Sequence, residues 1–320
     1  MGNNNSFLDA SRTGDSKKIS EYRQNYKKDN NATKDEKGRT ALILSSLNGN
    51  VEIVELLIQK GFNLEDKCDN GLTALLYASS RGYLKIVQLL LLNGADIEAC
   101  DKDGATSLLY AAHKGHLEVV KLLLEEGADV QVRNSSGMSA LIYASHQGFA
   151  DIAEVLLVAG ADTEARGEES RLQVAIRRAL LLKHESAAAE GGSDPSKPAV
   201  EQQREIDSRA GGYTALMRAA SFGYVEVVKV LLEKGADRDA STSELGKKAI
   251  DFARDPPSHI DHTSSHDEVV QLLLMHQPSR TATKSRSSPG AATLGTTTTA
   301  AVASLPRPSL SLFLEDKDMS

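Results

Sequence analysis

Tryptophan is absent from this 320-residue chain, aromatic residues make up only 4% of it, and cysteine occurs twice. The first residues read Met-Gly-Asn-Asn-Asn-Ser, without an apolar leader, and two cysteines are few for a disulfide-stabilised secreted protein. No apolar run approaches the roughly 18 residues that a membrane-spanning helix requires. We therefore expect a cytoplasmic protein, with membrane-associated and nuclear locations as alternatives.

A surplus of positive charge is also lacking. The chain carries 37 Lys and Arg against 44 Asp and Glu, which gives a formal net charge of −7. Proteins that bind nucleic acids broadly need a basic face that neutralises phosphates. We therefore expect no nucleic-acid partner.

Catalytic and metal-binding constellations are missing as well. Outside the repeated phrases described below, there is no Ser/His/Asp, Cys/His or paired-carboxylate arrangement, and no glycine-rich phosphate loop follows a strand. His259, His262 and His266 lie in a segment rich in Pro, Ser and Thr, without the ligand spacing of a zinc site. Cys68 and Cys100 supply only two thiols. We expect no enzymatic activity, no metal and no cofactor.

What the chain does contain is a recurring phrase: glycine, a hydroxyl residue two positions later, then a small residue and an aliphatic one. It begins at Gly38, Gly71, Gly104, Gly137 and Gly212, with a degenerate copy at Gly246. The first four of these glycines are 33 residues apart. A second phrase, Gly-Ala-Asp, follows in phase at Gly94, Gly127, Gly160 and Gly235. Two phrases locked in phase indicate an internal repeat.

Each repeat predicts two short antiparallel helices. The hydroxyl residues are suitable N-caps for the first helix: Thr40, Thr73, Thr106, Ser139 and Thr214. In the second repeat of the regular series, the first helix is expected near residues 74–80, ended by Gly82, and the second over residues 84–92, ended by Gly94. One such pair cannot bury its apolar face alone, so the repeats must stack.

The segment Tyr110-Ala-Ala-His-Lys-Gly-His-Leu-Glu-Val-Val-Lys-Leu-Leu-Leu124 resembles the second half of the ankyrin repeat almost letter for letter. The resemblance covers residues 6–167 and 209–276, with Ala41, Ala74, Ala140 and Ala215 in place of the family's proline. It implies an all-α solenoid of about seven repeats with short β-hairpin-like finger turns. It also implies a monomer that binds a protein partner on its concave face.

The phase of the glycines divides the chain into five parts. We expect an N-terminal leader and capping repeat over residues 1–37, four regular repeats over 38–169, an insertion over 170–208, two further repeats over 209–277, and a disordered Ser/Thr/Pro-rich tail over 278–320. Gly212 follows Gly137 by 42 residues more than one period. A smaller expansion over residues 255–266 is expected between the two helices of the last repeat.

The function of the inserted and terminal segments is left open by the sequence. Residues 171–183 are compatible with a basic amphipathic helix that contacts a partner or a membrane, or with a tolerated loop. Residues 310–318 are either a short docking motif or part of a solvated tail.

The N-terminus fits the pattern for N-myristoylation, with Gly2 as the acylated residue and Ser6 at the required position. Alternatively, Ser6 caps the first helix. Because one myristoyl chain binds membranes only marginally, a membrane role requires a second signal, for which residues 171–183 are the candidate.

Stacking is expected to align one column of residues on the concave face: Leu44, Tyr77, Tyr110, Tyr143 and Arg218. Basic, amide and ring side chains follow at the helix ends: Arg81, His113, Lys114, His146, Gln147 and Phe222. Tyr and Arg are common anchors of interfaces, and the cations favour a partner with some negative charge. The alternative is that the tyrosines share a packing role inherited by duplication.

The sequence therefore predicts a non-catalytic scaffold or adaptor. Two alternatives are a membrane-tethered organiser anchored through Gly2 and a regulatory subunit of an enzyme. The fold hosts many unrelated partners, so it does not identify one.

Overall fold

The computed structural model describes residues 2–21, 33–167, 212–242, 246–256, 260 and 262–276. Within these ranges fourteen helices form seven consecutive pairs: α1 (Gly2–Thr13) with α2 (Ser16–Glu21), α3 (Ala41–Asn48) with α4 (Val51–Gln59), α5 (Ala74–Arg81) with α6 (Leu84–Leu92), α7 (Ser107–Lys114) with α8 (Leu117–Glu125), α9 (Ala140–Gln147) with α10 (Ala150–Val158), α13 (Ala215–Ser221) with α14 (Val225–Glu233), and α15 (Ala249–Arg254) with α16 (Ser264–Met275). The ranges contain isolated β-bridges but no longer strand.

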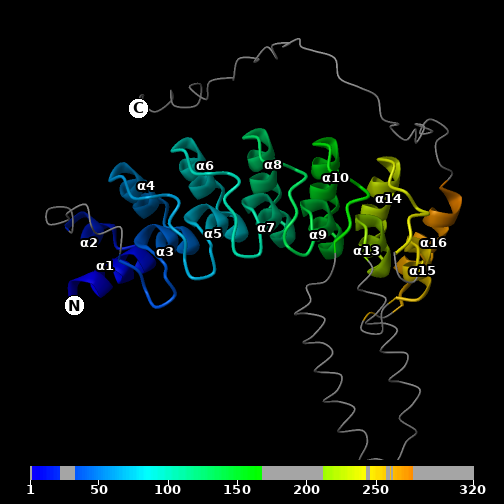
Figure 1. Cartoon of the computed structure of the whole chain (residues 1–320), viewed down its shortest axis with the longest axis horizontal. Coiled ribbons are helices and arrows are strands. Elements are labelled where there is room, and N and C mark those ends of the chain that lie inside the picture. The colour runs from blue at the N-terminus through cyan, green and yellow to red at the C-terminus, as the bar shows by residue number, and fades with distance from the viewer. Residues whose placement is uncertain are drawn as a thin grey trace, which may run out of the picture. The chain divides into compact units, whose positions relative to one another are not determined.

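The pairs stack so that first helices contact first helices and second helices contact second helices. Figure 1 shows one row of inner helices, α3 to α13, and a second row of outer helices, α4 to α14. A finger turn connects α4 to α5, α6 to α7 and α8 to α9. The all-α solenoid of about seven repeats is therefore confirmed.

The five predicted hydroxyl residues all occupy N-cap positions of inner helices, and four of them make the side-chain capping bond. Thr40, Thr73, Ser139 and Thr214 each accept a hydrogen bond from the backbone N–H three residues later, at 3.3–3.4 Å. Thr106 has the same extended backbone but makes no such bond. Thr106 therefore occupies the predicted N-cap position of α7, but its buried Oγ1 has no hydrogen-bond partner among the described residues.

The glycine after each inner helix is required both by its backbone and by the next repeat. Gly82 has φ of +74°, and a Cβ there would lie 2.5 Å from Nδ1 of His116 in the following pair. A Cβ at Gly115 would lie 2.6 Å from Cζ of Phe149. Substitution would therefore cost backbone strain and would push neighbouring repeats apart.

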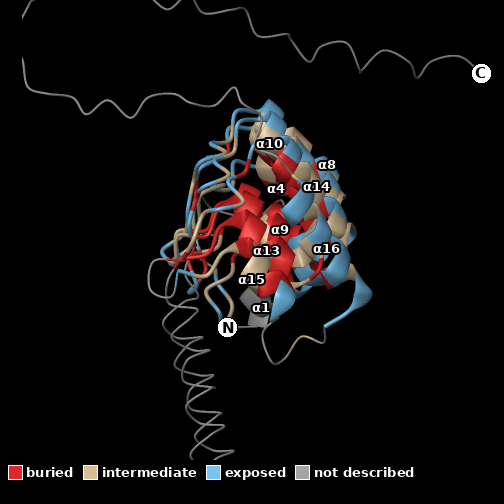
Figure 2. Ribbon diagram, turned by 90° about the vertical axis from the view of Figure 1, so that its right-hand side faces the viewer, coloured by how far each residue is buried: buried red, intermediate tan, exposed pale blue. Residues whose placement is uncertain are grey.

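The core lies between the two rows of helices. In Figure 2 the buried residues gather on the inner helices and on the sides of the outer helices that face them. In α6, Ile86, Val87 and Leu90 are fully buried at helical spacing, as the sequence predicts. Phe7 and Leu8 of α1 are also buried and extend the core into the first pair.

The long insertion leaves the array at the tip of one finger without breaking the stack. Gly167 and Tyr213 exchange two backbone hydrogen bonds of 3.1 and 2.9 Å, where a regular finger has a bond from Asn134 to Met138. Beyond this closure, Glu164 accepts a bond from the backbone N–H of Asp237 at 2.9 Å. The equivalent bond in a regular repeat joins residues 98 and 129 at 2.8 Å. The repeat phase therefore continues across the inserted residues.

Several predicted segments lie outside the described residues. They include the whole insertion at 170–208, with its candidate helix at 171–183, and the tail at 278–320. The expected expansion at 255–266 is too long, because α16 already begins at Ser264. Thr263 and His266 close its first turn through a 3.1 Å bond from the backbone N–H of Thr263 to Nδ1 of His266.

Candidate partner-binding surface

The inner helices α3, α5, α7, α9 and α13 contain no Asp or Glu. This is unusual in a chain with 44 acidic residues. We use the name inner-helix surface for the following partly or fully exposed side chains, which lie from the fourth residue of these helices to just beyond their ends. They are Leu47, Asn48, Tyr77, Ser80, Arg81, Tyr110, His113, Lys114, Tyr143, His146, Gln147 and Phe222.

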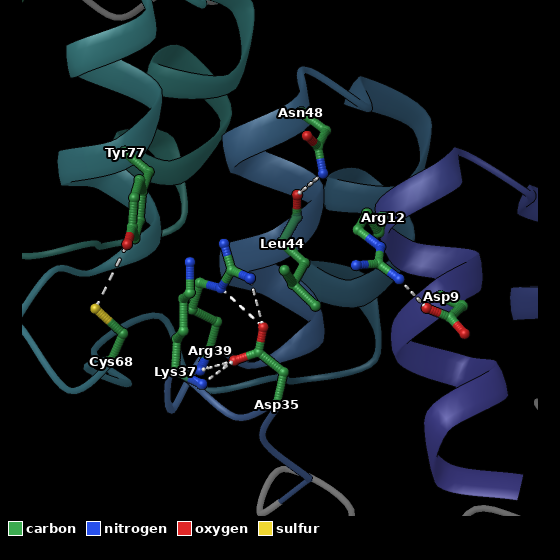
Figure 3. A network of polar contacts seen from close by, with 9 residues as sticks. All are labelled: Asp9, Arg12, Asp35, Lys37, Arg39, Leu44, Asn48, Cys68 and Tyr77. Atoms are coloured by element: carbon green, nitrogen blue, oxygen red, sulfur yellow. Dashed lines mark hydrogen bonds and ion pairs between the residues drawn. The ribbon is translucent and has the colours of Figure 1, made fainter. Parts of the chain in front are cut away.

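The three tyrosines attach the inner helices to the fingers. Tyr110 donates a 2.6 Å hydrogen bond to Oδ2 of Asp101, which lies nine residues earlier. Asn134 donates to the hydroxyl of Tyr143 at 3.0 Å across the same separation. The hydroxyl of Tyr77 lies 3.6 Å from Sγ of Cys68, as Figure 3 shows. The hydroxyl of each tyrosine therefore contacts a finger residue of its own repeat.

The repeat without a tyrosine makes its finger contact differently. Leu44 stands at the tyrosine position in α3, and its side chain is buried. The finger carboxylate of Asp35 pairs instead with Arg39, whose Nε donates to it at 2.8 Å (Figure 3). Burial opposes ionisation of Asp35, but hydrogen bonds from the side chain and backbone of Arg39 outweigh it and lower the pKa.

The tyrosine rings are half-buried and pack against the core. Burial, followed by the neighbouring Cys68 thiol, raises the pKa of Tyr77 to about 12. Burial and the bond to Asp101 likewise raise the pKa of Tyr110. The hydroxyls therefore remain protonated at neutral pH. Packing, which the sequence left as an alternative, is part of their role.

Histidine and aromatic side chains link neighbouring repeats along the surface. His113 meets the ring of Tyr143 edge-on, with centroids 4.9 Å apart, and His146 meets Phe222 in the same way at 4.8 Å. Burial, and then the charge of Lys114, lowers the pKa of His113. This histidine is therefore neutral at pH 7.

Arg81 and Lys114 are exposed at the last residues of α5 and α7. Neither forms an ion pair with any residue in the described ranges. By contrast, Lys121 on the outer helix α8 pairs with Glu118 at 2.8 Å. The inner-helix surface thus carries positive charge that no ion pair within the described ranges neutralises.

Arg218 departs from the predicted column. Its side chain is only 7% exposed, and its guanidinium carbon lies 4.1 Å from the centroid of the Tyr213 ring. This cation–π contact holds the arginine inside the sixth repeat. Phe222, one turn later, is the residue of α13 and its end that reaches the surface.

Tyr224 belongs beside the surface although the sequence argument missed it. Its ring stacks on Phe222 with centroids 5.6 Å apart. Ring residues also follow the inner-helix glycine in earlier repeats, at Tyr83, His116 and Phe149. That shared position was the available signal.

The next residues are the histidines and cysteines that were considered as metal ligands. His266 is 1% exposed, and its Nε2 lies 3.3 Å from the carbonyl oxygen of Ser221. His262 is exposed and His259 lies outside the described residues. Cys68 and Cys100 are free thiols. In the part of the chain that the structure covers, no three His, Cys, Asp or Glu side chains gather as a metal site.

The N-terminal helix is held on the array. Gly2 is the first residue of α1, which packs against α3 through its buried face. Among the described helices, none is long and apolar enough to cross a membrane.

Known proteins share this repeat. A family model described as "Ankyrin repeats (3 copies)" matches residues 7–101 and 90–166, and one described as "Ankyrin repeat" matches residues 211–243. The chain is 37% identical over 81 residues to the ankyrin repeat and KH domain-containing protein mask of Drosophila melanogaster. It is 38% identical over 77 residues to the ankyrin repeat domain-containing protein OPG015 of Monkeypox virus, and 33% identical over 116 residues to Rabankyrin-5 of Mus musculus.

These matches cover 25%, 24% and 34% of this chain, but only 2%, 17% and 9% of the three relatives. They therefore identify the repeat and not the activity of a whole protein. The family models together span more than half of the chain, from the first helix pair to the sixth. With the helix pairs, finger turns and stacked core described above, they show that the chain belongs to the ankyrin-repeat family.

Proposed function

We propose that the chain is a non-catalytic adaptor or scaffold that binds a protein partner along its inner-helix surface. The observation that carries the proposal is the row of acid-free inner helices, on which aromatic rings recur and two neighbouring helices, α5 and α7, end in the exposed cations Arg81 and Lys114. Stacking places equivalent positions side by side and so builds an extended surface from short helices. Ankyrin repeats generally serve as protein–protein interaction modules.

The chemistry of the surface suits recognition of another protein. The half-exposed rings of Tyr110, Tyr143 and Phe222 offer contact area that loses little side-chain entropy on binding. Their positions are fixed before binding by the finger hydrogen bonds and by the edge-on histidines. A surface arranged in advance loses less entropy when a partner docks.

The proposal is tested by affinity capture from the native cell with three purified forms of the full chain. These are the wild type, the double variant Gln147→Ala and Phe222→Ala, and the control Gln88→Ala on the exposed side of the outer helix α6. We expect the captured partners to bind the wild type and the control equally well, and to bind the double variant more weakly by about 1–3 kcal/mol. Thermal melts of the same samples exclude unfolding as the cause. Partners that bind the folded double variant as well as the wild type would place recognition elsewhere.

A further inference from the structure

We propose that the segment recognised by the inner-helix surface is acidic, adopts the polyproline II conformation, and presents two carboxylates, three residues apart, to Arg81 and Lys114 in turn. This inference rests on the proposed function and specifies the chemistry of the partner. It follows from the charge of the surface, the period of the repeats and the nature of the rings between the cations.

The charge distribution directs an acidic segment to the inner helices. The outer helices carry exposed carboxylates at the second position of α4, α8, α10 and α14. Glu118 and Glu226 pair with Lys121 and Lys229, both at 2.8 Å. Glu52 and Asp151 form no ion pair with any described residue. A negatively charged segment is repelled by Glu52 and Asp151 on α4 and α10 and attracted by Arg81 and Lys114. Like charges on the wrong face and opposite charges on the right one together give specificity.

The spacing of the two cations sets the spacing of the carboxylates. Arg81 and Lys114 are 33 residues apart and occupy the last residue of neighbouring inner helices, α5 and α7, which pack against each other. Packed helices lie about 8–10 Å apart. A polyproline II segment has three residues per turn and rises about 3.1 Å per residue, so side chains three apart share one face and are about 9.3 Å apart.

A β-strand does not fit this geometry. Its side chains alternate between faces, so those on one side are separated by about 6.6 or 13 Å along the chain. Neither distance matches the separation of neighbouring helices. The separation of neighbouring inner helices therefore favours the polyproline II conformation over a β-strand.

The side chains near the cations suit prolines in the intervening positions. The rings of Tyr77, Tyr110 and Tyr143 are half-buried in three successive inner helices, and the first two of these helices end in Arg81 and Lys114. Aromatic-lined grooves are the usual receptors for polyproline II segments, whose preformed backbone loses little entropy on binding.

The same position in the next two repeats defines the rest of the segment. It is Gln147 in α9 and Phe222 after α13, and these two inner helices pack directly despite the insertion between them in sequence. The partner residue opposite Gln147 is expected to be polar, and the residue opposite Phe222 to be apolar. The recognised pattern is thus acidic, acidic, polar and apolar at intervals of three residues.

The experiment measures binding of a fluorescein-labelled peptide, Glu-Pro-Pro-Glu-Pro-Pro-Gln-Pro-Pro-Leu, and of its reversed sequence, by fluorescence anisotropy with the full chain. One control peptide has both Glu replaced by Gln. A second has the same composition with the two Glu adjacent. The protein variants are Arg81→Gln and Lys114→Gln, with Lys85→Gln on the exposed side of the outer helix α6 as the matched control.

We expect one of the two peptide orders to bind, and each inner variant to weaken it about threefold to fivefold at low salt, as for an exposed ion pair. Lys85→Gln should bind as the wild type does. Raising the ionic strength to about 1 M should weaken binding further, because the screening length falls to about 3 Å. Equal binding of the spaced and adjacent Glu peptides, or equal binding by wild type and both inner variants, overturns the inference.

The capture experiment separates this failure from a failure of the proposed function. One possible result is that a captured protein no longer binds the variant altered at residues 147 and 222 but still binds Arg81→Gln and Lys114→Gln at any ionic strength. The inner-helix surface then binds a partner, and the acidic segment is ruled out. If a captured protein binds all of these variants as well as it binds the wild type, both the proposed function and the inference about the acidic segment are overturned.

Discussion

The hydroxyl of Tyr110 donates a 2.6 Å hydrogen bond to Oδ2 of Asp101, which joins an inner helix to the finger before it. The other carboxylate oxygen of Asp101 accepts from the backbone N–H groups of Asp103 and Ala105, at 2.9 and 2.8 Å. One aspartate thus fixes both the finger turn and the tyrosine ring. Tyr110 therefore forms part of the inner-helix surface and also stabilises the finger turn.

The first prediction separates the hydroxyl of Tyr110 from its ring. Tyr110→Phe should lower the free energy of unfolding by about 1–2 kcal/mol, because it removes a hydrogen bond to a charged group while leaving the other bonds of Asp101 intact. Urea unfolding measures the change. Tyr83→Phe is the control, since its hydroxyl bonds to no described residue. A Tyr110→Phe chain as stable as the wild type would show that the finger contact contributes little.

Removal of the whole ring should cost more. Tyr110→Ala also loses packing against the core, so it should be less stable than Tyr110→Phe. It should remain more stable than Leu108→Ala, because Leu108 is 1% exposed and its truncation opens a cavity worth about 2–5 kcal/mol. The same urea titrations rank the three variants, and a different order would show that the ring is buried more tightly than its exposure indicates.

The second prediction concerns a buried hydroxyl that recurs on the inner helices. Ser79 is fully buried, and its Oγ has no hydrogen-bond partner among the described residues. Ala112 occupies the same position one repeat later. Ser79→Ala should therefore raise the free energy of unfolding by about 1 kcal/mol, because an unsatisfied buried hydroxyl is costly.

Ser45 provides the matched control for Ser79→Ala. It is equally buried, but its Oγ donates a 3.1 Å bond to the carbonyl oxygen of Leu42. Ser45→Ala should not stabilise the chain. If thermal melts show the same change for both variants, burial alone and not the missing partner determines the effect.

The third prediction is that the array folds without the insertion. Deletion of residues 168–209 leaves three residues between Gly167 and Tyr213, the number that separates Asn134 from Met138 in a regular finger. Shortening a connection from 45 residues to 3 is almost four halvings of its length, and each is worth about 0.6 kcal/mol for a flexible loop. The shortened chain should be at least as stable as the full chain, by up to about 2 kcal/mol.

Thermal unfolding by circular dichroism tests this deletion. A single cooperative transition at or above the temperature of the full chain is expected. A lower or broadened transition would show that inserted residues hold the fifth and sixth repeats together.

The fourth prediction is a loss of stability on acidification that depends on His113. Burial, followed by the charge of Lys114, lowers the pKa of His113 below its usual value of 6.5. At a pH between these two pKa values, His113 is protonated in the unfolded chain and neutral in the folded chain. This contribution to stability is therefore present above pH 6.5 and is lost as the pH falls below 6.5 towards the pKa of the folded state.

Melting temperatures of the wild type and His113→Gln between pH 7.5 and 5 test this dependence. Other groups also titrate in this range, so the difference between the two curves is the relevant quantity. We expect the wild type to lose more stability than the variant as the pH falls. Parallel curves would show that His113 remains easily protonated beside Tyr143.

The sequence by itself determined the repeat and, in the one repeat for which helix bounds were predicted, the two helices. The 33-residue phase of the glycines located α5 at Ala74–Arg81 and α6 at Leu84–Leu92 to within one residue. Local signals were sufficient because a solenoid repeat contacts only its neighbours and every repeat solves the same packing problem. The same periodicity showed where the inserted residues enter the chain.

The tertiary structure alone decided which side chains form the surface. Tyr110 and Arg218 share one column, yet the first is half-exposed and tied to a finger, whereas the second is buried on Tyr213. Thr106 matches the other caps in sequence and makes no capping bond. These outcomes depend on side-chain rotamers and on neighbours brought close by stacking. A pattern of residue types along the chain does not specify either of them.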